Sequence, residues 1–213
     1  MTDAQRYPTA DREAALREES LWPVAGVDEA GRGALAGPVV AGAVVADWCL
    51  QLPWYSEVRD SKQLSKAKRE QLFPIICNET LGIGVGIVQN DDIDAIGIAA
   101  ATRKAMYLAL ENLAVRPNFV LVDWMTLPQL RVRQEGIVKG DSRCLSIACA
   151  SIIAKVTRDR IMEGMDERHP GYDFARHKGY GTAAHLGLLE KNGACPIHRF
   201  SFRPVRLVEA GLL

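Results

Sequence analysis

The segment Asp28-Glu-Ala-Gly-Arg-Gly-Ala-Leu-Ala-Gly37 joins two apolar runs, Val24-Ala-Gly-Val-Asp28 and Gly37-Pro-Val-Val-Ala-Gly-Ala-Val-Val-Ala46. Short valine-rich runs are typical of buried strands. Pro38 lacks a backbone N–H, so it fits the start or the edge of the second strand. Because the glycines suit a tight or irregular connection, we predict a hairpin-like pair of strands.

The rest of the chain predicts further strands and helices. Leu81-Gly-Ile-Gly-Val-Gly-Ile-Val88 alternates glycine with bulky residues, the period-2 pattern of a strand that packs closely against a neighbour. Ser65 is a suitable N-cap for a charged helix through about Asn78, and Asp141 or Ser142 is suited to open a long amphipathic helix. The other expected elements are strands at 119–123 and 136–139, the latter at an edge, and helices at 95–113 and 182–191. Together they indicate one mixed α/β body.

We expect a single domain over residues 21–206, whose part from about 167 to 206 is a helical attachment. Residues 1–20 are polar and are expected to be a disordered or helical leader, and residues 207–213 a tail. No internal repeat or low-complexity segment divides the chain.

Composition excludes several classes of protein. The 213 residues include 26 lysines and arginines and 26 aspartates and glutamates, so the average charge favours neither an acidic nor a basic partner. Residues 131–206 nevertheless hold 14 basic and 8 acidic residues. No segment suits a membrane span or a secretory signal, and five cysteines without a CxxC pair indicate reduced thiols. We therefore expect a cytoplasmic monomer that binds no membrane and has no evident protein partner.

Two apolar runs end in an aspartate, Asp28 in the first and Asp123 in Phe119-Val-Leu-Val-Asp123, and Glu29 follows Asp28 directly. Carboxylates at the ends of buried strands are costly to desolvate, and converging carboxylates raise one another's pKa. A divalent cation removes this conflict, and ligands that are all oxygen favour Mg²⁺ or Mn²⁺ over zinc. The sequence therefore predicts a metal site at these strand ends.

A plainer interpretation exists for each carboxylate. A single aspartate at a strand end more often caps a loop or pairs with a surface base, although two matched positions weaken that interpretation. Asp141 is suited to cap the helix that follows it, and capping does not exclude metal binding. Because adjacent strand residues point to opposite faces, Asp28 and Glu29 converge only if the glycines distort the strand after Ala30.

The glycines Gly31, Gly33 and Gly37 invite comparison with a dinucleotide-binding loop. That loop requires a following helix whose N-terminus meets the pyrophosphate, and here a proline and a valine-rich run follow instead. We therefore disfavour a nucleotide-cofactor enzyme. Glycines on both sides of Arg32 would let the backbone approach a sugar–phosphate chain, and a plain turn is the alternative.

Four motifs resemble ribonuclease HII and occur in the order in which that family carries them. They are Asp28-Glu-Ala-Gly-Arg-Gly33, Asp60-Ser-Lys62, Lys139-Gly-Asp141 followed by Ser151-Ile-Ile-Ala-Lys155, and His177-Lys-Gly-Tyr-Gly-Thr182. With Pro196-Ile-His-Arg-Phe-Ser-Phe202, the resemblance spans about Trp22 to Pro204. It implies an α/β protein of RNase H-like fold, a mixed β-sheet flanked by helices with a C-terminal helical extension.

The resemblance also implies an activity and a site. The activity is hydrolysis of the RNA strand of RNA–DNA hybrids and incision 5′ of single ribonucleotides in duplex DNA, leaving 3′-hydroxyl and 5′-phosphate ends. The implied metal ligands, which are also the catalytic residues, are Asp28, Glu29, Asp123 and Asp141, holding Mg²⁺ or Mn²⁺, two ions when substrate is bound. The implied nucleic-acid contacts are Gly31, Arg32, Gly33 and Tyr180, with Lys62 and Lys139 neutralising phosphates.

One position departs from the family pattern. Trp124 follows Asp123, where the family more often has a small residue, and this affects the expected shape of the substrate groove rather than the metal ligand. An alternative from another class is a noncatalytic nucleic-acid-binding module that has kept the fold and the basic surface. The presence of all four carboxylates argues against that module.

Overall fold

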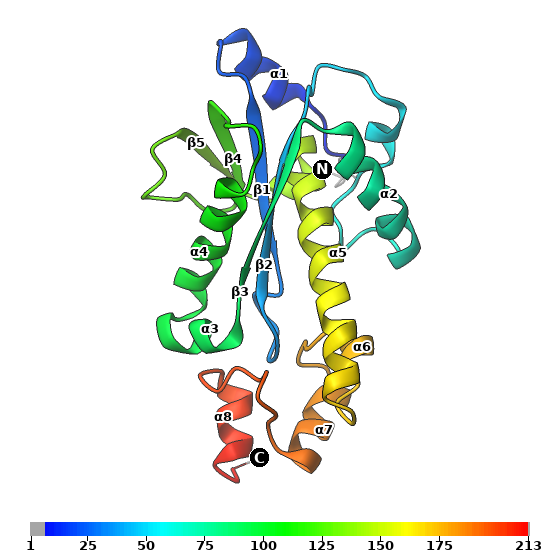
Figure 1. Ribbon diagram of the computed structural model, residues 1–213, viewed down its shortest axis with the longest axis vertical. Helices are drawn as coiled ribbons and strands as arrows, with labels where there is room; N and C mark the ends of the chain where they lie inside the picture. The colour runs from blue at the N-terminus through cyan, green and yellow to red at the C-terminus, as the bar shows by residue number, and fades with distance from the viewer. Residues whose placement is uncertain (1–6, 213) are drawn as a thin grey trace, which may run out of the picture.

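The computed structural model describes residues 7–212, which form a mixed sheet of five strands flanked by helices (Figure 1). The strands are β1 (Val24–Ala30), β2 (Val39–Val45), β3 (Gly82–Val88), β4 (Phe119–Asp123) and β5 (Arg133–Ile137), in the order β3-β2-β1-β4-β5. β2 pairs antiparallel with both β1 and β3, whereas β4 lies parallel to β1 and to β5. The predicted fold class is confirmed.

β1 and β2 form the expected antiparallel pair, with Ala30 opposite Val40 nearest the connection. Pro38 directly precedes β2, as its missing N–H requires. The connection 31–38, all of it described, contains no helix. A dinucleotide-binding loop is therefore excluded, because that loop requires a helix to follow the strand directly.

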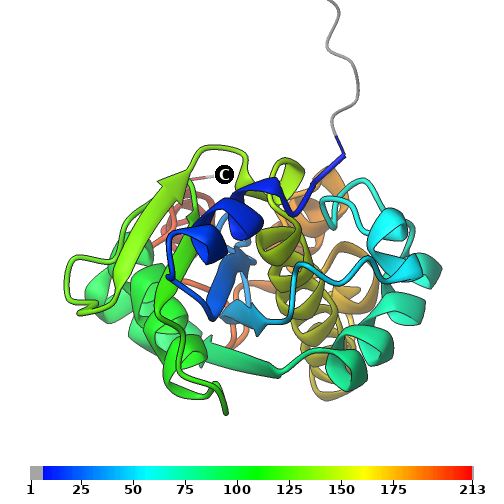
Figure 2. The same ribbon diagram turned by 90° about the horizontal axis from the view of Figure 1, so that it is seen from above.

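Helices cover both faces of the sheet, as the view from above shows (Figure 2). One face packs against α5 (Leu145–Arg168) and α2 (Lys66–Glu79), and the other against α4 (Ile98–Glu111). Successive side chains of β1 alternate between these cores, since Val24 packs on the α5 side and Ala25 and Val27 on the α4 side. The same alternation later decides which carboxylates can meet.

The glycines of β3 allow α4 to approach the sheet closely. A Cβ on Gly84 would lie 2.0 Å from the carbonyl oxygen of Ala109, and one on Gly86 would lie 1.9 Å from that of Ala105. No larger residue fits at either position. The close neighbour expected from the alternating pattern is therefore α4.

Helix boundaries follow the sequence signals in part. Ser65 caps α2 by accepting a hydrogen bond from the N–H of Lys68, as predicted. The single helix expected at 95–113 is instead α3 (Asn90–Ile96) and α4, separated by Gly97 with φ of 78°. The edge strand β5 begins at Arg133, whereas the prediction began it at 136. The prediction missed the first residues of β5 because they are polar and do not form an apolar run.

The start of α5 corrects the prediction for Asp141. Asp141 lies in a 3₁₀ turn, η2 (Gly140–Ser142), and α5 begins only at Leu145. The side-chain acceptor at this helix start comes from α1 (Asp11–Glu18), where Oε1 of the buried Glu13 accepts a hydrogen bond of 2.8 Å from the N–H of Ser146. Asp141 is therefore not needed as a cap, and its carboxylate is free for another role.

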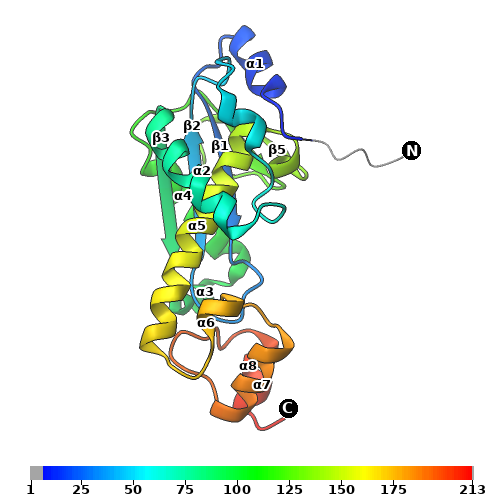
Figure 3. The ribbon, with the colours of Figure 1, turned by 90° about the vertical axis from the view of Figure 1, so that its right-hand side faces the viewer.

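The C-terminal helices lie beyond the end of the sheet, below it in Figure 1 and away from α1 in Figure 3. They are α6 (Phe174–His177), α7 (Ala183–Asn192) and α8 (Arg203–Glu209). They pack in two apolar clusters that also include Leu35, Ala36 and Met162. The helix expected at 182–191 is α7, and Thr182 caps it by accepting a hydrogen bond from the N–H of His185. A 3₁₀ helix, η1 (Pro53–Glu57), completes the elements, and within residues 7–212 no helix is long and apolar enough to cross a bilayer.

Candidate active site

Three aspartates from three different elements meet at the carboxyl ends of β1 and β4. Asp28 belongs to β1, Asp123 is the last residue of β4, and Asp141 lies in η2. Each offers a carboxylate oxygen, and these oxygens all lie within 4.8 Å of one another. The predicted convergence of the two strand ends is therefore observed, with Asp141 as the third member.

Strand register produces this meeting. In the parallel pair of β1 and β4, Val27 is opposite Val122, so Asp28 and Asp123 are neighbours one residue further along. Alternation directs both toward the face covered by α5, and η2 lies immediately before α5. The backbone N–H of Gly140 donates a hydrogen bond of 2.7 Å to Oδ1 of Asp123, which joins η2 to the end of β4.

The cluster is electrostatically unfavourable when it is empty of cations. Burial, followed by the charges of Glu29 and Asp123, raises the pKa of Asp28 well above its usual value. Burial also raises the pKa of Asp123, as does the charge of Asp141. The pKa of Asp141 is raised by burial and by the charge of Asp60. Such a group holds all its negative charges at low cost only when a cation lies among them.

The donor set fits a hard divalent cation. Oδ2 of Asp28 is buried and has no hydrogen-bond partner among the described residues, although buried polar atoms are nearly always paired. Carboxylate oxygens are the ligands that Mg²⁺ and Mn²⁺ prefer. The nearest base is Lys62, whose Nζ lies 3.4 Å from Oδ2 of Asp141 while its side chain remains 73% exposed.

Glu29 lies apart from the three aspartates. β1 stays paired through Glu29 as far as Ala30, and although the chain turns at Gly31 with φ of 88°, this turn does not bring Glu29 into the cluster. Its two carboxylate oxygens instead each lie 3.3 Å from Nε1 of Trp124. Burial raises the pKa of Glu29, with the indole hydrogen bond acting against this and the charge of Asp123 adding to it. Glu29 therefore stands at the border of the cluster rather than within it.

A cavity of about 480 Å³ opens beside the cluster. Asp123 and Asp141 line it together with three of the other residues singled out from the sequence, namely Lys62, Lys139 and Trp124. Lys139 is exposed and has a left-handed backbone with φ of 55°, which turns the chain into η2. Both lysines therefore border the acidic groove.

The segment Gly31-Arg32-Gly33 forms the turn after β1 and contacts Tyr180. Gly31 has φ of 88°, and a Cβ there would lie 1.8 Å from Nε of Arg158, so only glycine fits. Its N–H donates a hydrogen bond of 3.2 Å to the hydroxyl of Tyr180. Gly33 has open space where a side chain would begin, and Arg32 is exposed. The structure thus brings together all four residues for which the resemblance implies backbone or sugar contacts.

Two buried arginines donate hydrogen bonds to backbone carbonyls of this turn and of the residues beside it. The sequence analysis did not predict either arginine as part of the site. Arg199 donates to the carbonyl oxygens of Gly31, Arg32 and Gly37 at 2.8 to 3.0 Å. Arg158 donates to three more carbonyls, those of Ala36, Pro38 and Lys178. Burial lowers the pKa of Arg199 to about 9, so it still carries its charge at pH 7. Arg199 lies within Pro196-Ile-His-Arg-Phe-Ser-Phe202, and this motif was the one feature of the sequence that could have indicated its role.

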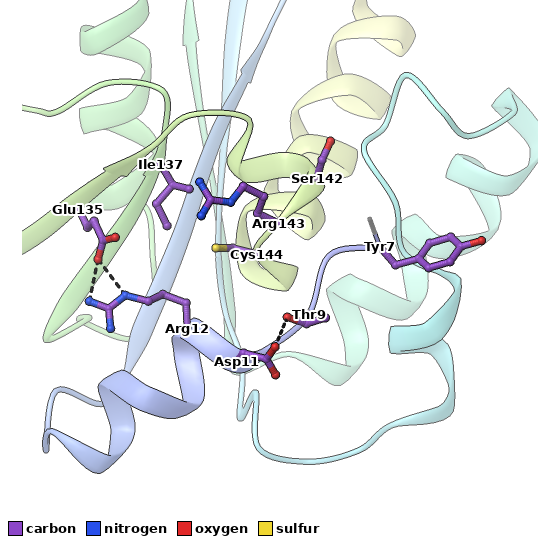
Figure 4. Close-up of a pocket in the computed structure, with 9 residues that line it drawn as sticks. All are labelled: Tyr7, Thr9, Asp11, Arg12, Glu135, Ile137, Ser142, Arg143 and Cys144. Carbon is purple, nitrogen blue, oxygen red and sulfur yellow. Dashed lines mark hydrogen bonds and ion pairs between the residues drawn. The ribbon is translucent and has the colours of Figure 1, made fainter. Parts of the chain in front are cut away.

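A second pocket of about 410 Å³ lies between α1, β5 and the start of α5 (Figure 4). Arg12 and Glu135 form an ion pair across it, and Thr9 donates a hydrogen bond to Asp11. It contains none of the three clustered aspartates. Its polar side chains are largely paired with one another, so it does not compete with the acidic groove as an active site.

Known proteins match both the sequence and the fold of this chain. Residues 25–205 match the family described as Ribonuclease HII. Ribonuclease HII of Dehalococcoides mccartyi is 51% identical over 205 residues, covering 96% of this chain and 97% of that protein. Ribonuclease HII of Acetivibrio thermocellus is 50% identical and covers 90% of this chain and 73% of that protein.

Among solved structures, ribonuclease H2 from Pyrococcus horikoshii has a TM-score of 0.76 and 28% identity, covering 89% of this chain and 98% of that one. The match to the family extends from β1 into α8 and therefore includes the acidic cluster, the glycine turn and the buried arginines. The chain belongs to the ribonuclease HII family.

Proposed function

We propose that this member of the ribonuclease HII family is a metal-dependent endoribonuclease that hydrolyses the RNA strand of RNA–DNA hybrids and cuts duplex DNA on the 5′ side of a single ribonucleotide. The products would carry 3′-hydroxyl and 5′-phosphate ends. The observation that carries the proposal is the convergence of Asp28, Asp123 and Asp141 at a groove, with an unpaired buried oxygen on Asp28.

The carboxylates would hold two Mg²⁺ or Mn²⁺ ions when substrate is bound, with Glu29 as the fourth ligand. Bound ions supply activation of a water, neutralisation of the scissile phosphate and stabilisation of the leaving 3′ oxygen. The chain's own residues prepare this site. The N–H of Gly140 orients Asp123, and the exposed amine of Lys62 is able to leave Asp141 and meet a phosphate.

Recognition of the ribonucleotide is assigned to the turn after β1 and to Tyr180. The exposed Arg32 and the unobstructed backbone of Gly33 would contact the sugar–phosphate chain, where the 2′-hydroxyl distinguishes RNA from DNA. The ring of Tyr180 would stack on the deoxyribose that follows, a contact that an added 2′-hydroxyl would disturb. The hydrogen bond from Gly31 to the hydroxyl of Tyr180 supports a joint role, because it ties the two contacts to each other.

The test is cleavage of an end-labelled DNA duplex that contains one ribonucleotide, beside an all-DNA duplex, with Mg²⁺, with Mn²⁺ and with excess EDTA. We expect a metal-dependent cut on the 5′ side of the ribonucleotide and none in the all-DNA duplex. Asp123→Asn should abolish cleavage while retaining duplex binding. Glu167→Gln, which alters an exposed carboxylate on α5, serves as the matched control and should cut normally.

A noncatalytic module makes the opposite prediction. Such a protein would bind the duplex with the same salt dependence but would cut it with neither metal. Normal turnover by Asp123→Asn at matched metal concentration would instead leave the family activity in place and remove the proposed role of the cluster.

A further inference from the structure

Trp124 contacts two residues of the site, Arg32 and Glu29, that form no ion pair with each other. The guanidinium carbon of Arg32 lies 4.2 Å from the centroid of the Trp124 ring. At the edge of the same indole, Nε1 lies 3.3 Å from each carboxylate oxygen of Glu29. Within residues 7–212, no ion pair joins Arg32 to Glu29 directly. The indole is therefore the connection between the glycine turn and the carboxylate at the border of the cluster.

The backbone at Trp124 is held in an unfavourable conformation. Its φ is 50°, in the left-handed region that bulky residues rarely adopt, and its N–H donates a hydrogen bond of 2.9 Å to the carbonyl of Ile137. Trp124 follows Asp123 directly at the end of β4, and its indole reaches Glu29 on β1. Such outliers persist where the surrounding structure over-determines them, and they concentrate at functional sites.

Packing in the core does not account for this residue. Trp124 is 37% exposed and belongs to none of the apolar core clusters among the described residues. It lines the groove that also contains Asp123 and Asp141. One ring face is covered by Arg32, and the indole N–H is directed at Glu29. The side chain of Trp124 therefore makes both of its polar interactions, through the ring face and through the single N–H donor, with residues of the site.

We propose that Trp124 is a positioning residue with two separable tasks. Its ring face holds the guanidinium of Arg32 in the orientation that meets the sugar–phosphate chain. Its Nε1–H fixes the carboxylate of Glu29 at the border of the three-aspartate cluster, where it serves as the fourth ligand of the metal site. The inference rests on the proposed function, in which Arg32 contacts the sugar–phosphate chain and Glu29 is a metal ligand.

The two tasks should be affected differently by two substitutions of Trp124. Trp124→Phe keeps an aromatic face for Arg32 but removes the indole N–H, whereas Trp124→Leu removes both. Trp22 offers a matched control, because it is also 37% exposed and has a guanidinium, that of Arg17, 5.4 Å from its ring centroid, yet it precedes β1 at the opposite end from Asp28. Trp22→Phe and Trp22→Leu should therefore leave every readout below unchanged.

Two binding measurements separate the tasks without requiring turnover. Calorimetric titration of the substrate-free protein with Mn²⁺ should give an affinity about tenfold weaker for both Trp124 variants, the scale of a lost hydrogen bond to a charged group. Fluorescence anisotropy in EDTA with the ribonucleotide-containing duplex should show near wild-type affinity for Trp124→Phe and a loss of about threefold for Trp124→Leu.

Double variants show whether Trp124 acts through its two neighbours. In an Arg32→Ala background, Trp124→Leu should cause no further loss of duplex affinity, and in a Glu29→Gln background, Trp124→Phe should cause no further loss of Mn²⁺ affinity. Full additivity in both backgrounds, or wild-type binding in both single variants, overturns the inference. Absence of cleavage by the wild-type protein would overturn the proposed activity alone, because neither binding readout depends on turnover.

Discussion

The guanidinium of Arg199 donates a hydrogen bond of 2.8 Å to the carbonyl oxygen of Gly31, 168 residues earlier in the chain. A second N–H of the same side chain bonds to the carbonyl of Arg32 at 2.9 Å. Because both carbonyls point inward to Arg199, the turn presents the exposed side chain of Arg32 and the open backbone of Gly33 outward. The C-terminal extension thereby sets the shape of the turn that follows β1.

Replacing Arg199 should therefore impair both folding stability and substrate binding. Arg199→Lys keeps the charge but cannot supply three donors in a planar fork, so buried carbonyls lose their partners. We expect a loss of about 2 to 4 kcal/mol in the free energy of unfolding. Urea denaturation measures it, with Arg176→Lys, whose side chain is 80% exposed, as the control expected to change little. Equal stability of the two variants would contradict the structural role assigned to Arg199.

Removing a charge from the acidic cluster should stabilise the protein when metal is absent. Asp28→Asn relieves repulsion from Glu29 and Asp123, and its amide is able to donate to the neighbouring carboxylates. In EDTA we expect a gain of about 1 kcal/mol, or roughly 2 to 4 °C in Tm for a domain of this size. Saturating Mn²⁺ should raise the Tm of the wild type more than that of the variant.

Thermal unfolding with and without Mn²⁺ checks this, and Glu167→Gln should behave as wild type under both conditions. A lower Tm for Asp28→Asn in EDTA would mean that the carboxylates already stabilise one another, and the argument for a cation among them would lose its basis.

Acid should weaken the C-terminal extension through a buried histidine pair. Nε2 of His185 lies 3.1 Å from Nε2 of His198, and neither side chain is exposed. Burial lowers the pKa of each from 6.5 to about 4, with the charge of His177 adding to the shift at His185. Between these pH values the unfolded chain binds more protons than the folded protein, so stability is present above pH 6.5 and is lost toward pH 4.

The free energy of unfolding, measured with urea from pH 7 to pH 4, should therefore fall by a few kcal/mol as the pH decreases, at roughly 1.4 kcal/mol per pKa unit for each group. His169→Gln changes a histidine outside the pair and should retain most of this slope. Because the raised pKa values of the clustered aspartates act in the opposite direction, the pair is tested against His198→Gln, and a pH slope equal to that of the wild type in this variant would show that the pair titrates normally.

Tyr180 allows the ring and the hydroxyl to be tested separately. Tyr180→Phe keeps the ring but loses the hydrogen bond from Gly31, which is worth about 1 kcal/mol, so a fewfold loss in cleavage at a single ribonucleotide is expected. Tyr180→Ala also removes the stacking surface and should cost a further tenfold or more. Rates on a single embedded ribonucleotide and on a long RNA–DNA hybrid are compared. Equal rates for wild type and Tyr180→Ala on the first substrate would leave Tyr180 as packing only.

Local patterns in the sequence were sufficient for the elements that build the site. The valine-rich runs predicted β1, β2 and β4, because a buried strand is recorded in consecutive apolar residues. The aspartates that end two of these runs predicted Asp28 and Asp123 as candidate ligands. The predicted start of the edge strand β5 was three residues too late, because residues 133–135 are polar and none of them is fully buried.

Contacts between distant residues were decided by tertiary structure alone. Parallel register placed Asp28 beside Asp123, while the two-residue period of the same strand left Glu29 at the border of the cluster rather than within it. The interactions of Trp124 with Arg32 and of Arg199 with Gly31 join segments that are far apart in the chain. Local sequence periodicity does not indicate which distant side chain will make such a contact. Sequence therefore determined which residues are candidates for the chemistry, and packing of the sheet and the C-terminal extension determined how they are oriented.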